Sequence, residues 1–188
     1  MSRLDHDYLY AQPKAKRAGV KLERRAELRV PVQHQGRRAS AAELAELLTN
    51  PQLVLQQLLS GEQLEPLMDP GQFLYTPRPL ELPGYRLAPQ VRFLAQWQAP
   101  MLAISLSSYR LPGLGVLERK ACYRFSAELQ PTDGGLQVRA QATLELASGA
   151  GGLPQPLLAF LGNRALGLIF GRLERRCRRN LPGLGAHG

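Results

Sequence analysis

Two segments in the second half of the chain alternate between apolar and polar residues. Residues 120–130 and 136–146 both do so, and the Pro-Thr-Asp-Gly-Gly stretch 131–135 between them is a turn signal. Alternate side chains of a strand point to opposite faces of its sheet, so the pattern predicts a β-hairpin with one apolar and one polar face. The apolar positions are Ala121, Tyr123, Phe125, Ala127 and Leu129 in the first strand, and Leu136, Val138, Ala140, Ala142, Leu144 and Leu146 in the second.

The last long segment, residues 153–181, predicts a helix with an apolar first half and a cationic second half. Its apolar side chains cover most of a helical wheel, which is typical of a buried helix. We expect the first half to lie on the apolar face of the hairpin, whose strands match it in length. Asn163 and Arg164 interrupt the apolar run and disfavour a membrane span.

The cationic half of this helix contains five arginines. Because these side chains point in every direction around the helix, we expect this half to leave the body, either in water or against an anionic partner. A second interpretation is that they only complement the helix dipole. The residues are Arg172, Arg175, Arg176, Arg178 and Arg179.

The first part of the chain predicts short elements. Residues 1–25 lack periodicity and predict a disordered basic arm. Residues 28–32 alternate, and Pro31 places that strand at a sheet edge. A capping box at 40–43 begins one short helix, and Asn50-Pro51 begins another.

The middle of the chain predicts further antiparallel strands. They lie at 64–68, 72–76, 91–97 and 102–106, and the proline-rich segment 77–90 is irregular. A strand, two helices, several strands and a final helix make an α+β domain over residues 26–181. Residues 182–188 are expected to be a disordered tail.

The composition and charge of the chain limit the classes of partner that it could bind. The 188 residues suit one domain, and the net charge of +9 lies in residues 1–38 and 172–179, while the rest is nearly neutral. A folded nucleic-acid-binding domain has a basic face, so nucleic acid is disfavoured as a partner of the body. The cationic ends leave docking on anionic membrane, protein or RNA as an alternative function.

Candidate reactive residues are few. The only histidines are His6, His34 and His187, two of them in the terminal arms, so we expect no metal, no cofactor and no catalytic residue set. Cys122 and Cys177 fit no metal-ligand spacing and indicate free thiols in a reducing compartment, with a bridge between them as the alternative. Residues 1–10 resemble neither a signal nor a transit peptide. We expect a cytoplasmic protein, free or peripheral to a membrane, and the oligomeric state is left open.

Short stretches of the chain carry a resemblance to a known family. They lie at 50–54, 73–89, 89–91, 153–158 with 161–162, and 169–175. Here the chain resembles the START-like superfamily (SRPBCC, or polyketide cyclase and Bet v 1-like) over residues 26–181. More narrowly, it is similar to the cyanobacterial and chloroplast family called domain of unknown function nineteen-ninety-seven. It departs from that family in a longer insert at 148–152 and in its arginine-rich C-terminal end.

The resemblance implies a helix-grip fold. In this fold a curved antiparallel β-sheet wraps around a long C-terminal α-helix, and two short helices follow the first strand. The superfamily often has an apolar cavity between sheet and helix, and its members bind lipids, sterols, pigments or polyketides, with some acting as cyclases.

The leading hypothesis is therefore a non-catalytic domain that binds a hydrophobic small molecule or lipid. Arg164, or Tyr75, Tyr85 or Tyr109, would hold a polar end, although Arg164 could instead pair with a strand glutamate or reach the edge. The alternatives are a core filled by the same side chains, the docking function above and, third, a cyclase. The predicted ligand-binding residues are Trp97, Tyr123, Phe125, Val138, Leu144, Leu157, Leu161, Arg164 and Leu168.

Overall fold

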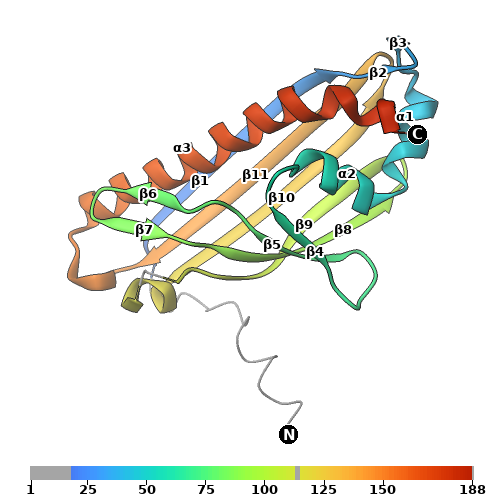
Figure 1. Ribbon diagram of the computed structural model, residues 1–188. Helices are drawn as coiled ribbons and strands as arrows, with labels where there is room; N and C mark the ends of the chain where they lie inside the picture. The colour runs from blue at the N-terminus through green and yellow to red at the C-terminus, as the bar shows by residue number, and fades with distance from the viewer. Residues whose placement is uncertain (1–17, 113–114, 188) are drawn as a thin grey trace, which may run out of the picture.

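The computed structural model describes residues 18–112 and 115–187 (Figure 1). Its large sheet is antiparallel, with the strand order β1-β11-β10-β9-β8-β5-β4. These strands are β1 (Ala18–Pro31), β4 (Gln63–Pro66), β5 (Gln72–Thr76), β8 (Gln90–Gln98), β9 (Met101–Arg110), β10 (Ala121–Thr132) and β11 (Gly135–Ala147). Two small hairpins are β2 (Gln33–His34) with β3 (Arg37–Arg38), and β6 (Leu80–Leu82) with β7 (Tyr85–Leu87).

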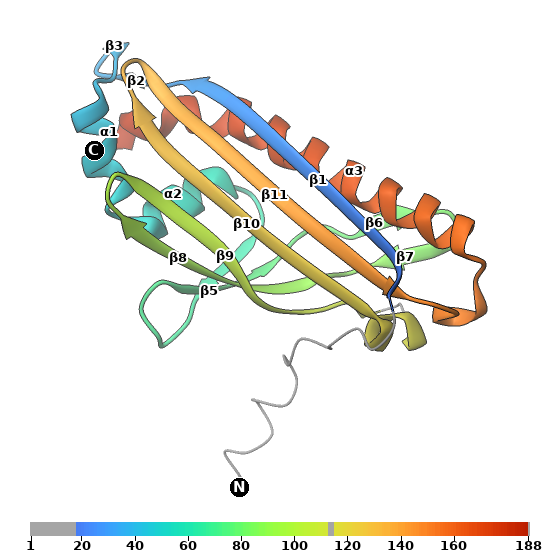
Figure 2. The same ribbon diagram turned by 180° about the vertical axis from the view of Figure 1, so that it is seen from behind.

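The helices cover one face of this sheet. The long helix α3 (Gln155–Asn180) lies along that face beside β1, and the β6–β7 hairpin flanks its other side (Figures 1 and 2). The short helices α1 (Ala41–Leu48) and α2 (Pro51–Leu58) follow the β2–β3 hairpin and lie at the end of the sheet near the C-terminus of α3. The remaining elements are 3-10 turns, η2 (Gly115–Lys120), η3 (Ala150–Gly152) and η4 (Leu181–His187). The α+β helix-grip architecture predicted from the sequence is confirmed.

The predicted hairpin is β10 and β11, with Ala121 opposite Leu146 and Leu129 opposite Val138. β11 begins with a glycine, Gly135, because a Cβ atom there would lie 2.3 Å from the carbonyl oxygen of Val30 on β1. The apolar residues of both strands lie on the face that α1 and α3 cover. A second glycine, Gly162, lets α3 approach the sheet, because a Cβ there would lie 2.4 Å from a methyl carbon of Leu22.

The first strand is longer than predicted. β1 begins at Ala18 and pairs with β11, so residues 18–25 belong to the sheet and not to the predicted arm. The other residues of that arm, 1–17, lie outside the described part of the chain. Arg24 hides the alternation in the sequence, because it takes an inward position between Leu22 and Ala26. Its guanidinium carbon lies 5.9 Å from the ring centre of Phe170 on α3, which is the geometry of a cation–π contact. As Pro31 indicated, this strand is an edge of the sheet.

The second half of α3 does not leave the body, which corrects the prediction. Cys177, Asn180 and Leu181 are buried, and the Asn180 side-chain amide donates to the carbonyl of Leu58 in α2 at 2.9 Å. The chain then continues as η4, in which Leu184 is buried, in place of the disordered tail predicted there. Apolar side chains on the turns beyond the arginines hold this end against α2.

The first half of α3 is buried on one side only, which is a second correction. Leu157 and Phe160 are 41% and 57% exposed, and Arg164 beside them is exposed as well. The sheet touches a single face of the helix, so apolar residues on the opposite face remain in water. Leu158, Leu161 and Leu166 form the face that is buried.

Candidate functional site

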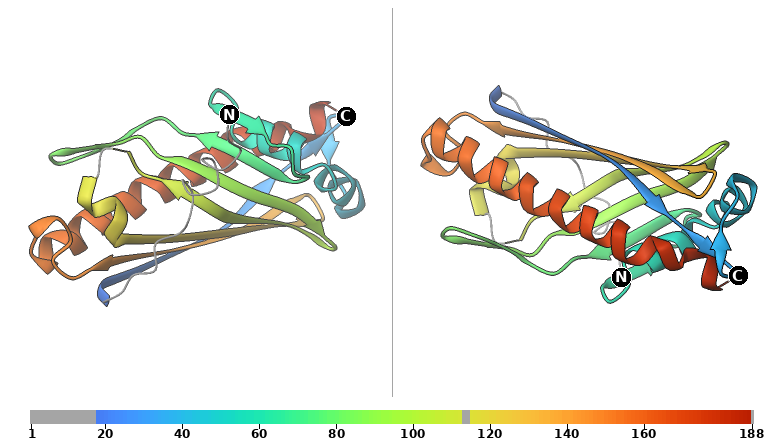
Figure 3. Two further views of the ribbon diagram at one scale, coloured as in Figure 1. Left: turned by 90° about the horizontal axis from the view of Figure 1, so that it is seen from below. Right: turned by 90° about the horizontal axis from the view of Figure 1, so that it is seen from above.

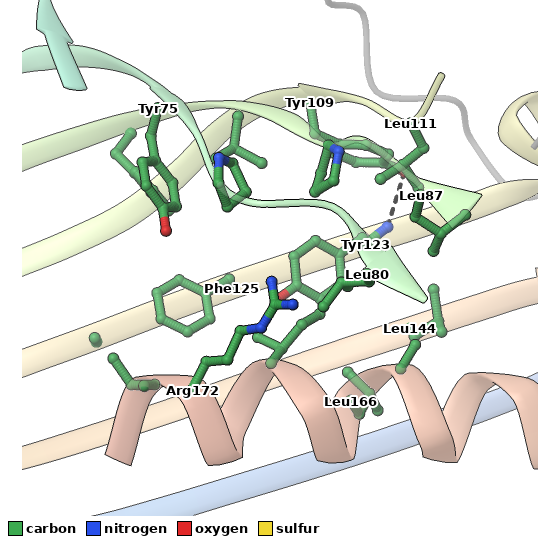
Figure 4. A pocket seen from close by; sticks show the side chains of 18 of the residues that line it. Tyr75, Leu80, Leu87, Tyr109, Leu111, Tyr123, Phe125, Leu144, Leu166 and Arg172 are labelled. Atoms are coloured by element: carbon green, nitrogen blue, oxygen red, sulfur yellow. Dashed lines mark hydrogen bonds between the residues drawn. The ribbon is translucent and has the colours of Figure 1, made fainter. Parts of the chain in front are cut away.

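An apolar cavity of about 230 Å³ lies between α3 and the sheet (Figure 4). One wall is the inner face of β10, where all of the alternating apolar positions line the space, continued by three residues of β11. The opposite wall is the buried face of α3, from Leu158 to Cys177, and Leu80, Leu82 and Leu87 of the β6–β7 hairpin close the side. The β10 and β11 residues of this wall are Ala121, Tyr123, Phe125, Ala127, Leu129, Val138, Leu144 and Leu146, and Tyr75, Val91, Phe93, Ile104 and Tyr109 extend it across β5, β8 and β9.

Two tyrosines on neighbouring strands are among the few polar groups that reach this cavity. The hydroxyl of Tyr109 is fully used, since it donates to the carbonyl of Ala121 and accepts from the amide of Tyr123, both at 2.9 Å. Burial raises the pKa of Tyr109 to about 12, and burial also raises the pKa of Tyr123. Both groups are therefore neutral phenols at physiological pH.

The hydroxyl of Tyr123 is available to a ligand. Among the described residues it has no hydrogen-bond partner, and its ring projects into the space between the sheet and α3 (Figure 4). The residue is half-buried, and it lines the cavity, so we attribute its accessible surface to the cavity rather than to bulk water. A lone hydroxyl in an apolar cavity can orient one polar atom of a bound molecule.

A buried polar cluster closes the α2 end of the cavity. Arg176 of α3 forms an ion pair with Glu62, whose side chain is 5% exposed, and also donates to the hydroxyl of Tyr75. Tyr75 in turn donates to the other oxygen of Glu62. Burial, followed by this bond to Glu62, raises the pKa of Tyr75. The cluster joins α3 to the start of β4 and to β5.

A second hollow of about 330 Å³ adjoins this cluster, and we call it the arginine pocket. Four of the five arginines predicted to face an anionic partner line it, whereas Arg178 lies outside. Arg172 and Arg176 line both this pocket and the apolar cavity. The arginine pocket is formed by Ser60, Gly61, Glu62, Arg78, Arg172, Arg175, Arg176 and Arg179.

The structure brings together five of the nine predicted ligand-binding residues. Tyr123, Phe125, Val138, Leu144 and Leu161 line the cavity, and their role in binding stays a prediction. The other four, Trp97, Leu157, Arg164 and Leu168, do not line it.

The four predicted residues that do not line the cavity lie elsewhere for two physical reasons. Leu157, Leu168 and Arg164 lie on the side of α3 that turns away from the sheet, so Arg164 cannot hold a polar end inside the cavity. Trp97 lies near the end of β8, beyond the strand residues Val91 and Phe93 that do line the cavity, and packs against the core.

Sequence reasoning missed the β6–β7 wall and the polar cluster. Residues 80–87 were expected to be irregular because prolines surround them, yet Leu80, Leu82 and Leu87 carry an apolar pattern that could have indicated a hairpin. The side chain of Tyr85, a predicted polar group, lies outside the described part. No local signal pairs Glu62 with Arg176, which is far away in the sequence.

The described part of the chain offers neither a metal-binding cluster nor a membrane-spanning helix. Residues 18–112 and 115–187 contain no cluster of three or more histidine, cysteine or acidic residues that could hold a metal ion. None of their helices has the length and apolar character needed to cross a membrane.

Known proteins resemble this chain in structure only. No protein-family model and no curated protein sequence matches it. The di-domain ARO/CYC BexL from the BE-7585A biosynthetic pathway aligns with a TM-score of 0.50 at 11% identity, over 87% of this chain and 50% of that one. A point mutant of Thalictrum flavum norcoclaurine synthase in complex with a transition state analogue gives 0.45 at 17% identity, over 84% and 94%. Ara h 8.0201 gives 0.40 at 17% identity, over 84% and 98%.

The strand order, the long C-terminal helix and the likeness to BexL together define the fold as the Bet v 1-like helix-grip fold. Figure 3 shows the arrangement from two further directions, with α3 lying across the sheet. At these identities the likeness establishes the fold alone, and the function has to be argued from the cavity.

Proposed function

We propose that this protein binds a small hydrophobic molecule or a single lipid chain in the cavity between α3 and the sheet, without catalysing a reaction. One observation carries the proposal: the apolar faces of sheet and helix leave about 230 Å³ of space between them instead of meeting as a filled core. Protein interiors are packed as densely as organic crystals and rarely leave voids much larger than a water molecule. This volume is close to the lower end of ligand pockets, about 300–1,000 Å³.

The chemistry of the walls supports an apolar ligand. Aromatic residues from three strands line one region of the cavity, with Phe93 5.9 Å from Tyr75 and 6.0 Å from Phe125 between ring centres. The hydroxyl of Tyr123 is the group that would orient a polar atom of the ligand. The narrower resemblance, to the family called domain of unknown function nineteen-ninety-seven, is part of the same proposal and rests on the proline-flanked start of α3 and on the segment 50–54.

The test uses a neutral fluorescent probe, N-phenyl-1-naphthylamine, whose emission rises on entering an apolar site. Ala127→Leu adds bulk from β10 into the cavity. Its matched control is Ala103→Leu, the same change on the neighbouring strand β9 at a position that does not line the cavity. Circular dichroism and thermal melting check that both variants fold.

We expect saturable binding by the wild type and by Ala103→Leu, and binding at least about tenfold weaker in Ala127→Leu, because the added carbons occupy the ligand's space. If Ala127→Leu does not fold, Val138→Phe fills the same cavity from β11. Absence of saturable binding to the wild type, or equal binding by wild type and the folded filled variant, would overturn the proposal.

A further inference from the structure

The arginine pocket gathers five guanidinium groups around a single carboxylate. Arg172, Arg175, Arg176 and Arg179 come from adjacent turns of α3, and Arg78 approaches from the segment after β5. Like charges three or four residues apart on a helix repel each other and destabilise it. The fold therefore holds cations together that would separate if they were only solvated.

Backbone and side-chain contacts fix this arrangement. Arg172 donates to the carbonyls of Arg78 and Pro79, at 2.7 and 2.9 Å, which keeps residue 78 beside the helix. Arg179 is held by a bond from its Nε to the Asn180 side-chain oxygen at 3.0 Å. The pocket is thus built from three separate segments, residues 60–62, Arg78 and the second half of α3, and contacts hold the side chains of Arg172, Arg176 and Arg179 in place.

The charge of the pocket is largely uncompensated. Glu62 is the only acidic residue among the described residues that line it, and that carboxylate is already paired with Arg176. Within the described part of the chain, Arg78, Arg172, Arg175 and Arg179 form no ion pair with a carboxylate. Arg78, Arg175 and Arg179 are also exposed, so an anion in solution can reach them.

The position of the pocket relates it to the proposed ligand. Arg172 and Arg176 line the apolar cavity on one side and the arginine pocket on the other, and Figure 4 shows Arg172 projecting from α3 beside Tyr123 and Phe125. A molecule whose apolar part fills the cavity would therefore bring its polar end to the arginines.

We propose that the arginine pocket binds the phosphate-type head group of an amphiphilic ligand whose tail occupies the apolar cavity. This inference rests on the proposed function. A phosphate monoester offers about −1.5 to −2 charges and three strong acceptor oxygens, which suit several guanidinium forks. A carboxylate has about one charge and two oxygens, so it would leave more of this cluster unpaired.

The experiment compares three probes: octyl phosphate, octanol with the same tail and no charge, and inorganic phosphate with no tail. Affinities are measured by displacement of N-phenyl-1-naphthylamine, and by calorimetry for inorganic phosphate. The test variant is Arg175→Gln with Arg179→Gln, which removes two exposed charges of the pocket. Arg178→Gln, an exposed arginine of the same helix outside the pocket, is the matched control.

We expect the wild type to bind octyl phosphate at least about tenfold more tightly than octanol, equivalent to about 1.4 kcal/mol. Added salt should reduce the difference. The double variant should bind octyl phosphate and octanol about equally, and its affinity for octanol should equal that of the wild type. Arg178→Gln should keep the full preference for octyl phosphate. Equal affinity of the wild type for the two probes, or equal losses in the double variant and in Arg178→Gln, would overturn the inference while leaving the proposed function intact.

Two further outcomes separate the sources of the anion. Binding of inorganic phosphate without any binding of octanol or the fluorescent probe would refute both the cavity as a ligand site and the proposed amphiphilic ligand. The arginine pocket would then be a site for free phosphate. Sedimentation with phosphatidylglycerol vesicles that depends on Arg175 and Arg179, without preference for monomeric octyl phosphate, would replace the inference by docking on a membrane surface.

Discussion

Replacement of Glu62 by alanine should destabilise the protein by about 3 kcal/mol. The Glu62 and Arg176 side chains are 5% and 15% exposed, so the variant leaves a largely buried guanidinium without its carboxylate. Removing one partner of a buried ion pair costs about 3–5 kcal/mol, and we take the lower value because Arg176 also borders the arginine pocket, where water can reach it. For a domain of this size the loss corresponds to a fall of roughly 6–12 °C in melting temperature.

Urea unfolding measures this loss, with the fluorescence of Trp97, the only tryptophan, and far-ultraviolet circular dichroism as two independent signals. Tyr75→Phe keeps the ion pair and removes one hydroxyl, so it should cost only about 0.5–1.5 kcal/mol. Glu65→Ala, at an exposed position of β4, should stay within about 0.5 kcal/mol of the wild type. If Glu62→Ala loses no more stability than Glu65→Ala, the buried pair does not hold α3 to β4 as argued.

Three further predictions concern other parts of the molecule. Asn180→Ala removes the donor that lies 2.9 Å from the carbonyl of Leu58 and should cost about 1–3 kcal/mol in urea unfolding; a loss below about 0.5 kcal/mol would show that this buried bond contributes little. Burial raises the pKa of the Cys177 thiol to about 11, so a disulfide reagent at neutral pH should modify it only after denaturant is added, and immediate reaction in the native protein would contradict its burial. The backbone amide of Ser40, followed by a neighbouring arginine, lowers the pKa of Glu43 from 4.5 to about 2. Because the pKa of Glu43 is lower in the folded than in the unfolded protein, its ionised carboxylate stabilises the fold. This stabilisation is complete above about pH 4.5 and is lost as the pH falls toward about 2. Glu43→Gln should therefore reduce the slope of stability against pH in that window, and an unchanged slope would contradict the assignment.

Much of the fold follows from local patterns. The β10–β11 hairpin was predictable because a period of two fixes which side chains share a face, and the turn at 131–135 fixes the register. The start of α1 was predictable for a similar reason: in its capping box the Ser40 hydroxyl accepts from the Glu43 amide at 3.3 Å, and all partners lie within four residues. β1 was recovered only in part, because Arg24 breaks its alternation and its partner, Phe170, is distant in the chain.

The sequence alone thus established the order of the main strands and helices, the apolar face of the hairpin and the apolar start of α3. Periodicity carries this information because it depends on neighbouring residues. It could not establish whether sheet and helix meet as a filled core or enclose a cavity, since that depends on the distance between two surfaces. Nor could it show that Arg78 and Arg172 meet across 94 residues of sequence. The cavity and the arginine pocket exist because the fold brings distant segments together, and the proposed function depends on them.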